Sequence, residues 1–324
     1  MTKRLTMLAL GLFTALAATA LAEDGKKIGF IYPTLNNPFF VDQSKGADKA
    51  AAEFGGTMIH LSGDNQVAKQ VQQMEDLIAQ KVNAIVIQAV DTGGIVAAVK
   101  EANAAGIPVF TTGERITGAD VKTAVFFDNI ESGELGGKWI SDNVEGGNVL
   151  ELIGILGTET ARQKSDGFKK GLLAGKNGDK FEIVASQPAD YDRTKALQVT
   201  ENVLQANDIA VIYAANDEMA LGAARAVEEA GLTGKVTIVG NDGTADAIEA
   251  VKAGSMAATI ATPGYLQGFI AVETALKHLS GVTVPAVIPE KSTPITRENA
   301  EEADSVLHGT APEQRYWESL YAKQ

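Results

Sequence analysis

The sequence predicts an α/β protein of two lobes, each built on a mostly parallel, doubly wound sheet. Short runs rich in Val and Ile alternate along the chain with longer amphipathic stretches. The short runs are apolar throughout, which is typical of strands that helices cover on both faces. Ten such runs are too many for one compact sheet of this kind. We therefore expect two sheets of about five or six strands each.

The predicted strands share this continuous apolar character and lie at 27–32, 57–61, 84–89, 108–112, 123–127, 148–155, 182–185, 210–214, 236–239 and 257–261. The predicted helices carry an apolar stripe instead and lie at 39–54, 67–81, 95–105, 131–143, 194–206, 219–230 and 266–279. Several helix ends are marked by capping or stop residues: the caps are Asp192, Asp217 and Thr244, and the stops are Gly106, Gly231 and Gly254.

The charge balance limits the partners that the chain can bind. Its 324 residues include 28 Lys and Arg against 41 Asp and Glu, a net charge of −13. A nucleic acid or an anionic lipid surface needs a positive footprint, and no local basic patch supplies one. The chain has no Cys, so a thiolate metal site and lipid attachment through cysteine are both excluded.

The first 22 residues read as an export signal. Lys3 and Arg4 precede an almost wholly apolar stretch at 5–18, and Ala20 and Ala22 form an A-x-A cleavage site. The apolar stretch of about 14 residues is shorter than the roughly 20 that a membrane span needs. We predict cleavage after Ala22 and a periplasmic location for the mature chain.

Polar residues gather where predicted strands end. Open parallel sheets bind ligands in the crevice outside the carboxyl ends of their strands. Two lobes that face each other could therefore line one shared cleft with these side chains. They are Asn36, Asn37, Gln88, Asp91, Glu114 and Arg115 in the first half and Asn216, Asp217, Asn241 and Asp242 in the second.

Signatures of catalysis are missing from the sequence. There is no G-x-G-x-x-G, P-loop or G-x-S-x-G pattern. His60, His278 and His308 are far apart, and no EF-hand spacing occurs. We therefore predict no catalysis, no cofactor and no metal, while a hydrolase built on a carboxylate pair stays an open alternative.

Four motifs in order carry a resemblance to a known family. They are Thr-Leu-Asn-Asn-Pro-Phe-Phe at 34–40, Ser-Gln-Pro-Ala-Asp-Tyr-Asp-Arg at 186–193, Asn-Asp-Glu-Met-Ala-Leu-Gly-Ala at 216–223 and Gly-Asn-Asp-Gly-Thr at 240–244. With them the chain resembles the periplasmic sugar-binding proteins of ABC importers, the ribose-binding group. The similarity runs over about 27–281, and the tail at 282–324 is not covered.

The resemblance implies the periplasmic binding protein type I fold: two Rossmann-like lobes with parallel doubly wound sheets, joined by a three-stranded hinge. The first lobe would comprise 23–127 and 263–288, and the second 128–262 and 289–324. The crossings should fall near 127–129, 261–262 and 287–289. The same lobe fold occurs in LacI-type repressors, but their N-terminal DNA-binding segment is replaced here by the export signal.

The resemblance also implies a function. A monomer would capture a small neutral sugar or polyol in the cleft, close around it, and deliver it to an inner-membrane ABC permease; a chemoreceptor is a further partner that the family allows. One alternative is a sensory protein that presents a furanosyl signal or polyol to a receptor. A second alternative is a periplasmic sugar-modifying enzyme.

The family's ligand contacts can be carried over residue by residue. The first lobe offers Asn37, Phe39, Phe40, Gln88, Glu114 and Arg115, and the second lobe and hinge offer Lys164, Tyr191, Asn216, Asp242 and Thr262. Arg162 is the alternative to Lys164 as the cation of the second lobe. Of two adjacent residues, Asp217 is expected to cap the helix and Asn216 to contact the ligand.

These residue types suit a neutral polyhydroxylated ligand. Each hydroxyl group both donates and accepts, as amides do, and a carboxylate such as Asp242 can accept from two hydroxyls. Aromatic rings can cover the C–H surface of a sugar ring. Several positions depart from the ribose protein: Gln88 replaces Asn, Lys164 replaces Arg, Tyr191 replaces Phe and Thr262 replaces Gln. Ribose itself is therefore not predicted.

Overall fold

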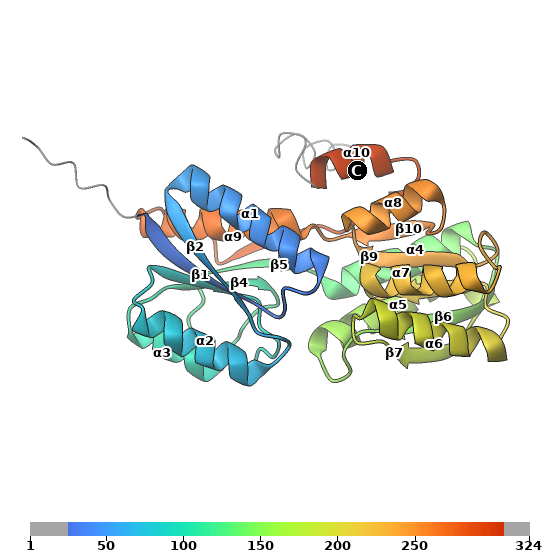
Figure 1. Ribbon diagram of the computed structural model, residues 1–324, viewed down its shortest axis with the longest axis horizontal. Coiled ribbons are helices and arrows are strands. Elements are labelled where there is room, and N and C mark those ends of the chain that lie inside the picture. Colours follow the sequence, from blue (N-terminus) through green and yellow to red (C-terminus); the bar gives the residue numbers. More distant parts are fainter. Residues whose placement is uncertain (1–24, 308–324) are drawn as a thin grey trace, which may run out of the picture.

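The computed structural model describes residues 25–307, which form two lobes side by side (Figure 1). The predicted export signal with its cleavage after Ala22, His308 and the tail beyond it lie outside the described residues. Each lobe holds one six-stranded sheet with helices on both faces. Between residues 25 and 307, no helix has the length and apolar character needed to cross a membrane.

The first sheet is parallel throughout, in the order β11-β5-β4-β3-β1-β2. Its strands are β1 (Lys26–Tyr32), β2 (Gly56–Ser62), β3 (Ala84–Ile87), β4 (Val109–Gly113), β5 (Thr123–Phe127) and β11 (Val287–Glu290). One face is covered by α1 (Pro38–Phe54) and α9 (Gly264–Leu279), and the other by α2 (Val67–Ala79) and α3 (Val96–Ala104). Phe30 packs toward the first pair and its neighbour Ile31 toward the second, which is why this strand is apolar from Ile28 onward.

The second sheet repeats this order as β12-β10-β9-β8-β6-β7, with β12 antiparallel to β10 and the other pairs parallel. Its strands are β6 (Gly147–Ile153), β7 (Phe181–Pro188), β8 (Val211–Ala214), β9 (Thr237–Asp242), β10 (Ala258–Ala261) and β12 (Thr293–Thr296). Its helices are α4 (Asn129–Asn143), α5 (Glu159–Ala174), the short η1 (Gly178–Lys180), α6 (Arg193–Ala206), α7 (Asp217–Glu229), α8 (Ala245–Ala253) and α10 (Ala300–Leu307). Helices α4 and α5 cover one face, and α6, α7 and α8 cover the other.

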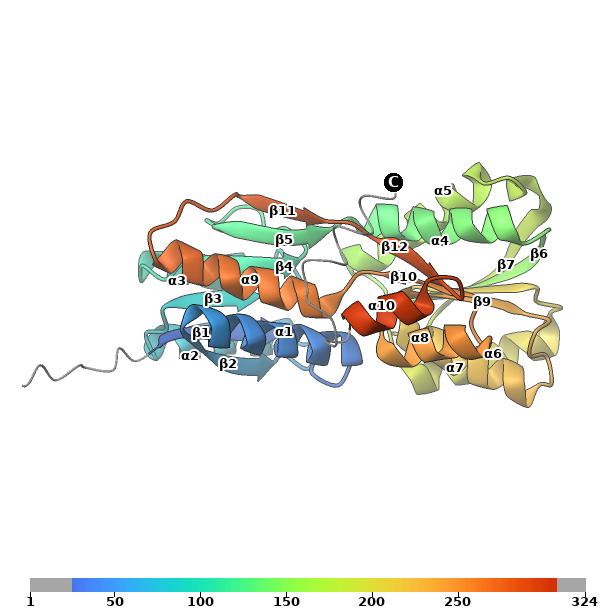
Figure 2. The same cartoon turned by 90° about the horizontal axis from the view of Figure 1, so that it is seen from above.

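The chain crosses between the lobes three times (Figure 2). Two crossings lie where predicted, after β5 at Phe127 and after β10 at Ala261. The third lies at 291–292, beyond the predicted 287–289, because Glu290 still pairs with Phe127 in the first sheet. The lobe boundaries stay a prediction at the level of single residues.

Two helix pairs approach closely through glycines. In α4 and α5, a Cβ added at Gly133 would collide with the backbone oxygen of Lys164, and one at Gly167 with that of Ile130. In α1 and α9, a Cβ at Gly268 would collide with the backbone oxygen of Gln43. These contacts set the positions of α5 and α1, two helices that carry predicted site residues.

All ten predicted strands are present, with ends shifted by a few residues. The predicted elements lack β11, β12, α5, η1 and α10, and α8 is indicated only by its cap Thr244 and its stop Gly254. Helix α5 is missed because it is mostly polar, with Ala161, Phe168 and Leu172 as its buried apolar residues. Asp192 caps α6 as predicted, with its carboxylate accepting from the Lys195 backbone N–H at 2.7 Å. Thr244 stands at the start of α8 but makes no side-chain capping bond.

Candidate functional site

The carboxyl ends of both sheets meet at the junction of the lobes. Strands β5 and β11 end at crossings, so the carboxyl ends of all strands in the parallel first sheet lie at this edge. Strand β10 also ends at a crossing, and β6, β7, β8 and β9 run parallel to it. The polar residues that follow these strands therefore lie on facing edges of the two lobes.

Asn216 caps α7, and the expectation that Asp217 does so is wrong. The Asn216 Oδ1 atom accepts from the Met219 backbone N–H at 3.0 Å. The amide nitrogen of Asn216 is buried and has no hydrogen-bond partner in the protein. Asn216 thus satisfies the helix end with one atom and keeps a donor for a ligand with the other.

Asp217 is a buried structural carboxylate. It accepts from the backbone N–H of Thr244 at 2.8 Å and from the hydroxyl groups of Thr244 at 3.1 Å and Thr259 at 2.6 Å. Burial raises its pKa, and the nearby Asp242 carboxylate raises it further. These bonds tie the ends of β9 and β10 to the start of α7.

Asp242 and Lys164 form the charged pair of the second lobe. Asp242 ends β9 with a backbone φ of 123°, a value rare outside glycine. The Lys164 ammonium lies 3.5 Å from its Oδ1 and donates to the backbone oxygen of Ala215 at 3.0 Å. Lys164 is 4% exposed and Asp242 is 8% exposed. Burial raises the pKa of Asp242, while Lys164 opposes this rise.

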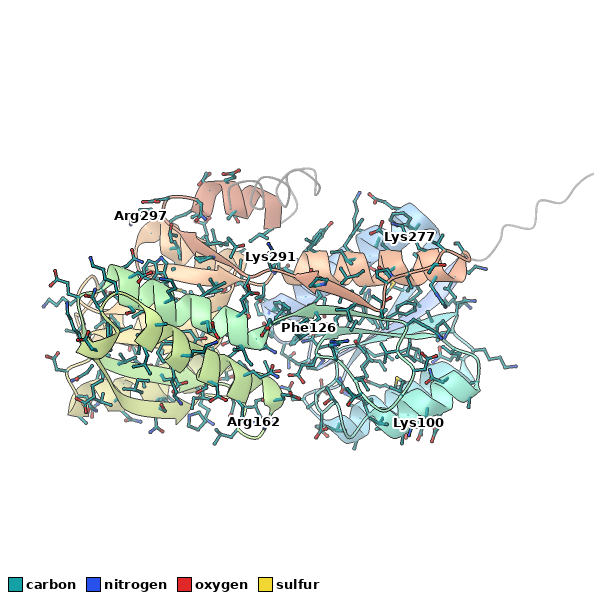
Figure 3. All side chains as sticks on the ribbon, turned by 180° about the vertical axis from the view of Figure 1, so that it is seen from behind. Lys100, Phe126, Arg162, Lys277, Lys291 and Arg297 are labelled. Carbon is teal, nitrogen blue, oxygen red and sulfur yellow. The ribbon has the colours of Figure 1, made fainter. Side chains whose placement is uncertain are left out.

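Arg162, the alternative cation, lies elsewhere. It is exposed, and its Nη1 donates to the backbone oxygen of Gly157 at 2.9 Å, which closes the loop before α5. Figure 3 shows Arg162 at the edge of the second lobe. Of the two candidates, the structure brings only Lys164 to Asp242.

Tyr191 lies over the end of β6. Its ring occupies the space that a side chain at residue 154 would need, so Gly154 leaves room for it. Its hydroxyl group is buried with no hydrogen-bond partner in the protein. Burial raises the pKa of Tyr191, and the carboxylate of Asp242 adds to this effect.

The first lobe contributes an aromatic group at the start of α1. Asn37 caps this helix, its Oδ1 accepting from the Phe39 backbone N–H at 2.9 Å. The Phe39 ring is almost fully buried and meets Phe40 edge-on at 5.1 Å between centroids and Phe127 at 6.4 Å. The cap thus fixes the helix whose first turn presents both predicted aromatic contacts.

Gln88 follows β3 and is held by side chains that the sequence reading missed. Its Oε1 accepts from the Gln43 amide nitrogen at 3.1 Å and from the Thr112 hydroxyl at 3.2 Å. Gln43 in turn contacts Gln267, and both are fully buried. The signal in the sequence is a glutamine on the buried face of each of two helices.

Glu114 and Arg115 have different surroundings in the structure. The Glu114 carboxyl accepts from the Thr160 hydroxyl of α5, so it contacts the opposite lobe. Burial raises the pKa of Glu114, although the Thr160 bond lowers it in part. Arg115 is exposed, and the structure does not bring it to the buried group.

Thr262 lies in the second crossing beside Asp242. Its backbone N–H donates to the Asp242 backbone oxygen at 3.0 Å, and its hydroxyl group is buried without a partner in the protein. A small cavity next to it is shared by both lobes. It is lined by Phe39 and Asp42 of α1, by the hinge and α9 residues 263–265, by Asp242, Gly243 and Thr244, and by Leu307 of α10.

The arrangement can bind a polar, uncharged molecule. Three buried polar atoms lack protein partners: the amide nitrogen of Asn216 and the hydroxyl groups of Tyr191 and Thr262. The same lobe holds an accepting carboxylate and a donating ammonium in Asp242 and Lys164; Asp242 accepts from the Thr262 backbone, and Lys164 donates to Ala215 next to Asn216. A buried polar atom without a partner is costly, so a ligand that supplies these bonds stabilises the site.

The chain is similar to known binding proteins along most of its length. The family described as periplasmic binding protein domain matches residues 28–283. The ribose import binding protein RbsB of Salmonella typhimurium is 41% identical over 283 residues, which are 87% of this chain and 93% of that protein.

Solved structures give the same picture. An ABC transporter periplasmic solute binding protein from Actinobacillus succinogenes with bound D-allose is 35% identical, with a TM-score of 0.79, covering 85% of this chain and 99% of that one. A solute binding protein from Bacillus halodurans with bound myo-inositol is 28% identical, with a TM-score of 0.80, covering 88% and 99%. The predicted two-lobe fold is thereby confirmed.

Proposed function

The chain belongs to the periplasmic binding protein family, and from that premise we propose that it captures a small monosaccharide or polyol between its lobes. The family consists of sugar-binding transport proteins of ABC importers and not of enzymes. The proposed partner of the loaded form is an inner-membrane ABC permease. Catalysis has no part in this function.

The observation that carries the proposal is the set of buried polar atoms without protein partners. Asn216 offers a donor, and the hydroxyl groups of Tyr191 and Thr262 can each donate or accept. Two of these residues are tied to the buried pair of Asp242 and Lys164: the Thr262 backbone N–H donates to Asp242, and Asn216 follows Ala215, to which Lys164 donates. A neutral ligand rich in hydroxyl groups can bond to all of them without adding a charge to the cleft.

Each contact has a proposed role. Asp242 accepts from two adjacent hydroxyl groups of the sugar, and the amide nitrogen of Asn216 donates to another. Lys164 balances the charge of Asp242 once water has left, and bonds to charged groups are about twice as strong as neutral ones. The rings of Phe39, Phe40 and Tyr191 cover the apolar surface of the sugar. Asn37, Gln88, Glu114 and Thr262 complete the site, and the exposed Arg115 and Arg162 are not assigned a ligand contact.

Ligand capture and closure are proposed to be one equilibrium. A ligand shifts a two-state protein only as far as it binds one state better than the other. The proposed contacts come from both lobes, so only the closed form makes all of them. The bond between Glu114 and Thr160 already joins the lobes in this structure.

A ligand panel tests the proposal. We expect D-ribose, D-allose or myo-inositol, or a close relative of these, to raise the melting temperature and to give a dissociation constant by calorimetry. A ligand at 100 times its Kd stabilises the folded state by about 2.7 kcal/mol. A panel of aldoses, ketoses and cyclitols that leaves the melting temperature unchanged throughout would refute the proposed function. Conversion of any of them to a new product would favour a sugar-modifying enzyme.

The location and the partners complete the proposal. Family members are periplasmic, and we propose export with removal of residues 1–22. N-terminal sequencing of the exported protein should begin at Glu23. We further propose a monomer whose closed form also fits a chemoreceptor, and light scattering with and without ligand tests the monomeric state.

A further inference from the structure

Four polar side chains form one line of hydrogen bonds through the interior of the first lobe. The Gln267 amide nitrogen donates to Glu290 Oε2 at 3.1 Å, and the Gln43 amide nitrogen donates to Gln267 Oε1 at 2.5 Å. The same nitrogen of Gln43 donates to Gln88 Oε1 at 3.1 Å. The line thus runs from the third crossing to a proposed ligand contact.

The fold makes this line possible. Helices α1 and α9 lie side by side (Figure 2) and approach closely at Gly268, whose added Cβ would strike the backbone oxygen of Gln43. This approach places the fully buried Gln43 and Gln267 in contact. Glu290 ends β11 and is also buried; Gln267 is its hydrogen-bond donor, and its second oxygen has no partner in the protein.

Along this line of bonds, the assignment of donors and acceptors is fixed. Glu290 Oε2 accepts from Gln267, as it does when the Glu290 carboxyl group is ionised or carries its proton on Oε1, so Gln267 turns its nitrogen toward Glu290 and its oxygen toward Gln43. Gln43 must then present its nitrogen to Gln267, and the same nitrogen reaches Gln88. Turning the Gln43 amide would bring its oxygen against two accepting oxygens. Its own Oε1 consequently stays buried without a partner.

These bonds fix the orientation of the Gln88 amide. Its Oε1 receives two donors, one from Gln43 and one from the Thr112 hydroxyl. These bonds leave the Gln88 nitrogen, which lies beside Gly113 at the end of β4, as the part of the amide that is available to a ligand. Gln88 therefore offers the ligand donors and not an acceptor.

We propose that Gln43, Gln267 and Glu290 are positioning residues that hold the Gln88 amide with its nitrogen toward the ligand. The inference rests on the proposed function, because it assumes that Gln88 contacts a sugar. As a donor, Gln88 favours a sugar that carries an accepting oxygen at one particular position of its ring. The three positioning residues act through Gln88 and do not touch the sugar.

Gln267→Met tests the proposal, since methionine keeps the length of the side chain and removes both hydrogen-bonding groups. We expect the dissociation constant for the sugar selected by the panel to rise about five- to tenfold, the equivalent of one neutral hydrogen bond. Monodeoxy derivatives give the sharper readout. One monodeoxy derivative should bind the wild type more weakly than the parent sugar does. The ratio of these two dissociation constants should be smaller in Gln267→Met, as it should be in Gln88→Ala.

Four further variants separate positioning from general damage. Gln73→Met removes a similarly buried glutamine of the same lobe, which donates to the Ser62 backbone oxygen, and should leave the deoxy-sugar profile unchanged. Glu290→Gln keeps an accepting oxygen and should lose less affinity than Glu290→Leu. Should Gln267→Met fail to fold, Gln43→Leu combined with Gln267→Leu replaces the polar contact with an apolar one and carries the same expectation.

The possible outcomes distinguish failure of this proposal from failure of the proposed function. If the double variant Gln267→Met/Gln88→Ala binds no more weakly than Gln88→Ala alone, the positioning residues act through Gln88. If the losses simply add, or if Gln267→Met keeps the wild-type deoxy-sugar profile, this proposal is overturned while the proposed function stands. If the wild type binds none of the sugars in the panel, the proposed function itself is overturned.

Discussion

At the scale of single residues, neighbouring polar positions have different roles that only tertiary contacts reveal. Asn216 and Asp217 are both good capping residues, and the sequence favours neither. Asp217 is drawn away from the helix end by three donors from Thr244 and Thr259, which are distant in the sequence. Asn216 then caps the helix. Gln43 and Gln267 were missed for a related reason, since their pairing depends on how two helices pack.

Asp242→Asn tests the proposed centre of the site. The change removes a carboxylate whose charge burial disfavours, but it also leaves the buried Lys164 ammonium without its partner, so the free energy of unfolding should fall. Sugar affinity should fall by roughly 1.5–3 kcal/mol, which is the range for a hydrogen bond to a charged group. Calorimetry measures the affinity and urea unfolding the stability. Asp246→Asn, which removes an exposed carboxylate of the same lobe, is the control, and wild-type affinity in Asp242→Asn would rule out this site assignment.

Glu290 predicts a pH dependence of stability. Burial raises the pKa of Glu290 from 4.5 to about 8. The folded state then binds this proton more tightly than the unfolded state, so the contribution is complete below pH 4.5 and is lost as the pH rises to 8. The slope can reach about 1.4 kcal/mol per pH unit. Urea unfolding of the wild type and Glu290→Gln between pH 5 and 8.5 should show stability declining less in the variant; parallel curves would contradict the shift.

At the scale of elements, the strands follow from the sequence and one important helix does not. Strands buried on both faces are apolar at every position, as Phe30 and Ile31 show, and this pattern is readable. Helix α5 carries Lys164, yet its contact with α4 is made by backbone against backbone at Gly133 and Gly167. An apolar period does not detect such a contact. The predicted positions of the crossings were close because the family resemblance supplied them.

Gly133→Ala is expected to move α5. The added methyl group collides with the backbone oxygen of Lys164, so the two helices must separate. Overpacking of this kind costs about 1–3 kcal/mol of stability. Sugar affinity should fall as well, because Lys164 moves relative to Asp242. Gly93→Ala is the control, since its added Cβ meets only the side chain of Asp91. Unchanged melting temperature and affinity in Gly133→Ala would show that the contact has no such role.

At the scale of the whole molecule, the two lobes are joined by three crossings and share one site. The number of strands already points to two sheets, and the resemblance adds the hinge. The exposure of Arg115 and the contact of Glu114 with Thr160 could not be read from the sequence, because they depend on how the lobes meet. The site is thus a property of the assembled molecule.

Closure should be visible in solution. Small-angle scattering of the ligand-free protein should give a larger radius of gyration than the protein with saturating sugar, since only the closed form brings both walls to the ligand. Glu114→Ala removes a contact between the lobes and should weaken sugar binding while leaving the loaded envelope compact. Identical scattering with and without sugar would contradict coupling of capture to closure.

The third crossing joins the edge strands of the two sheets. Strand β11 forms the edge of the first sheet, and β12, only two residues further on, forms the edge of the second. A chain that ends before Val287 would therefore lack an outer strand in both sheets. A chain that ends after Thr296 would keep both strands. Neither sheet can be completed until this one short stretch is in place, so the final steps of folding in the two halves depend on the same ten residues.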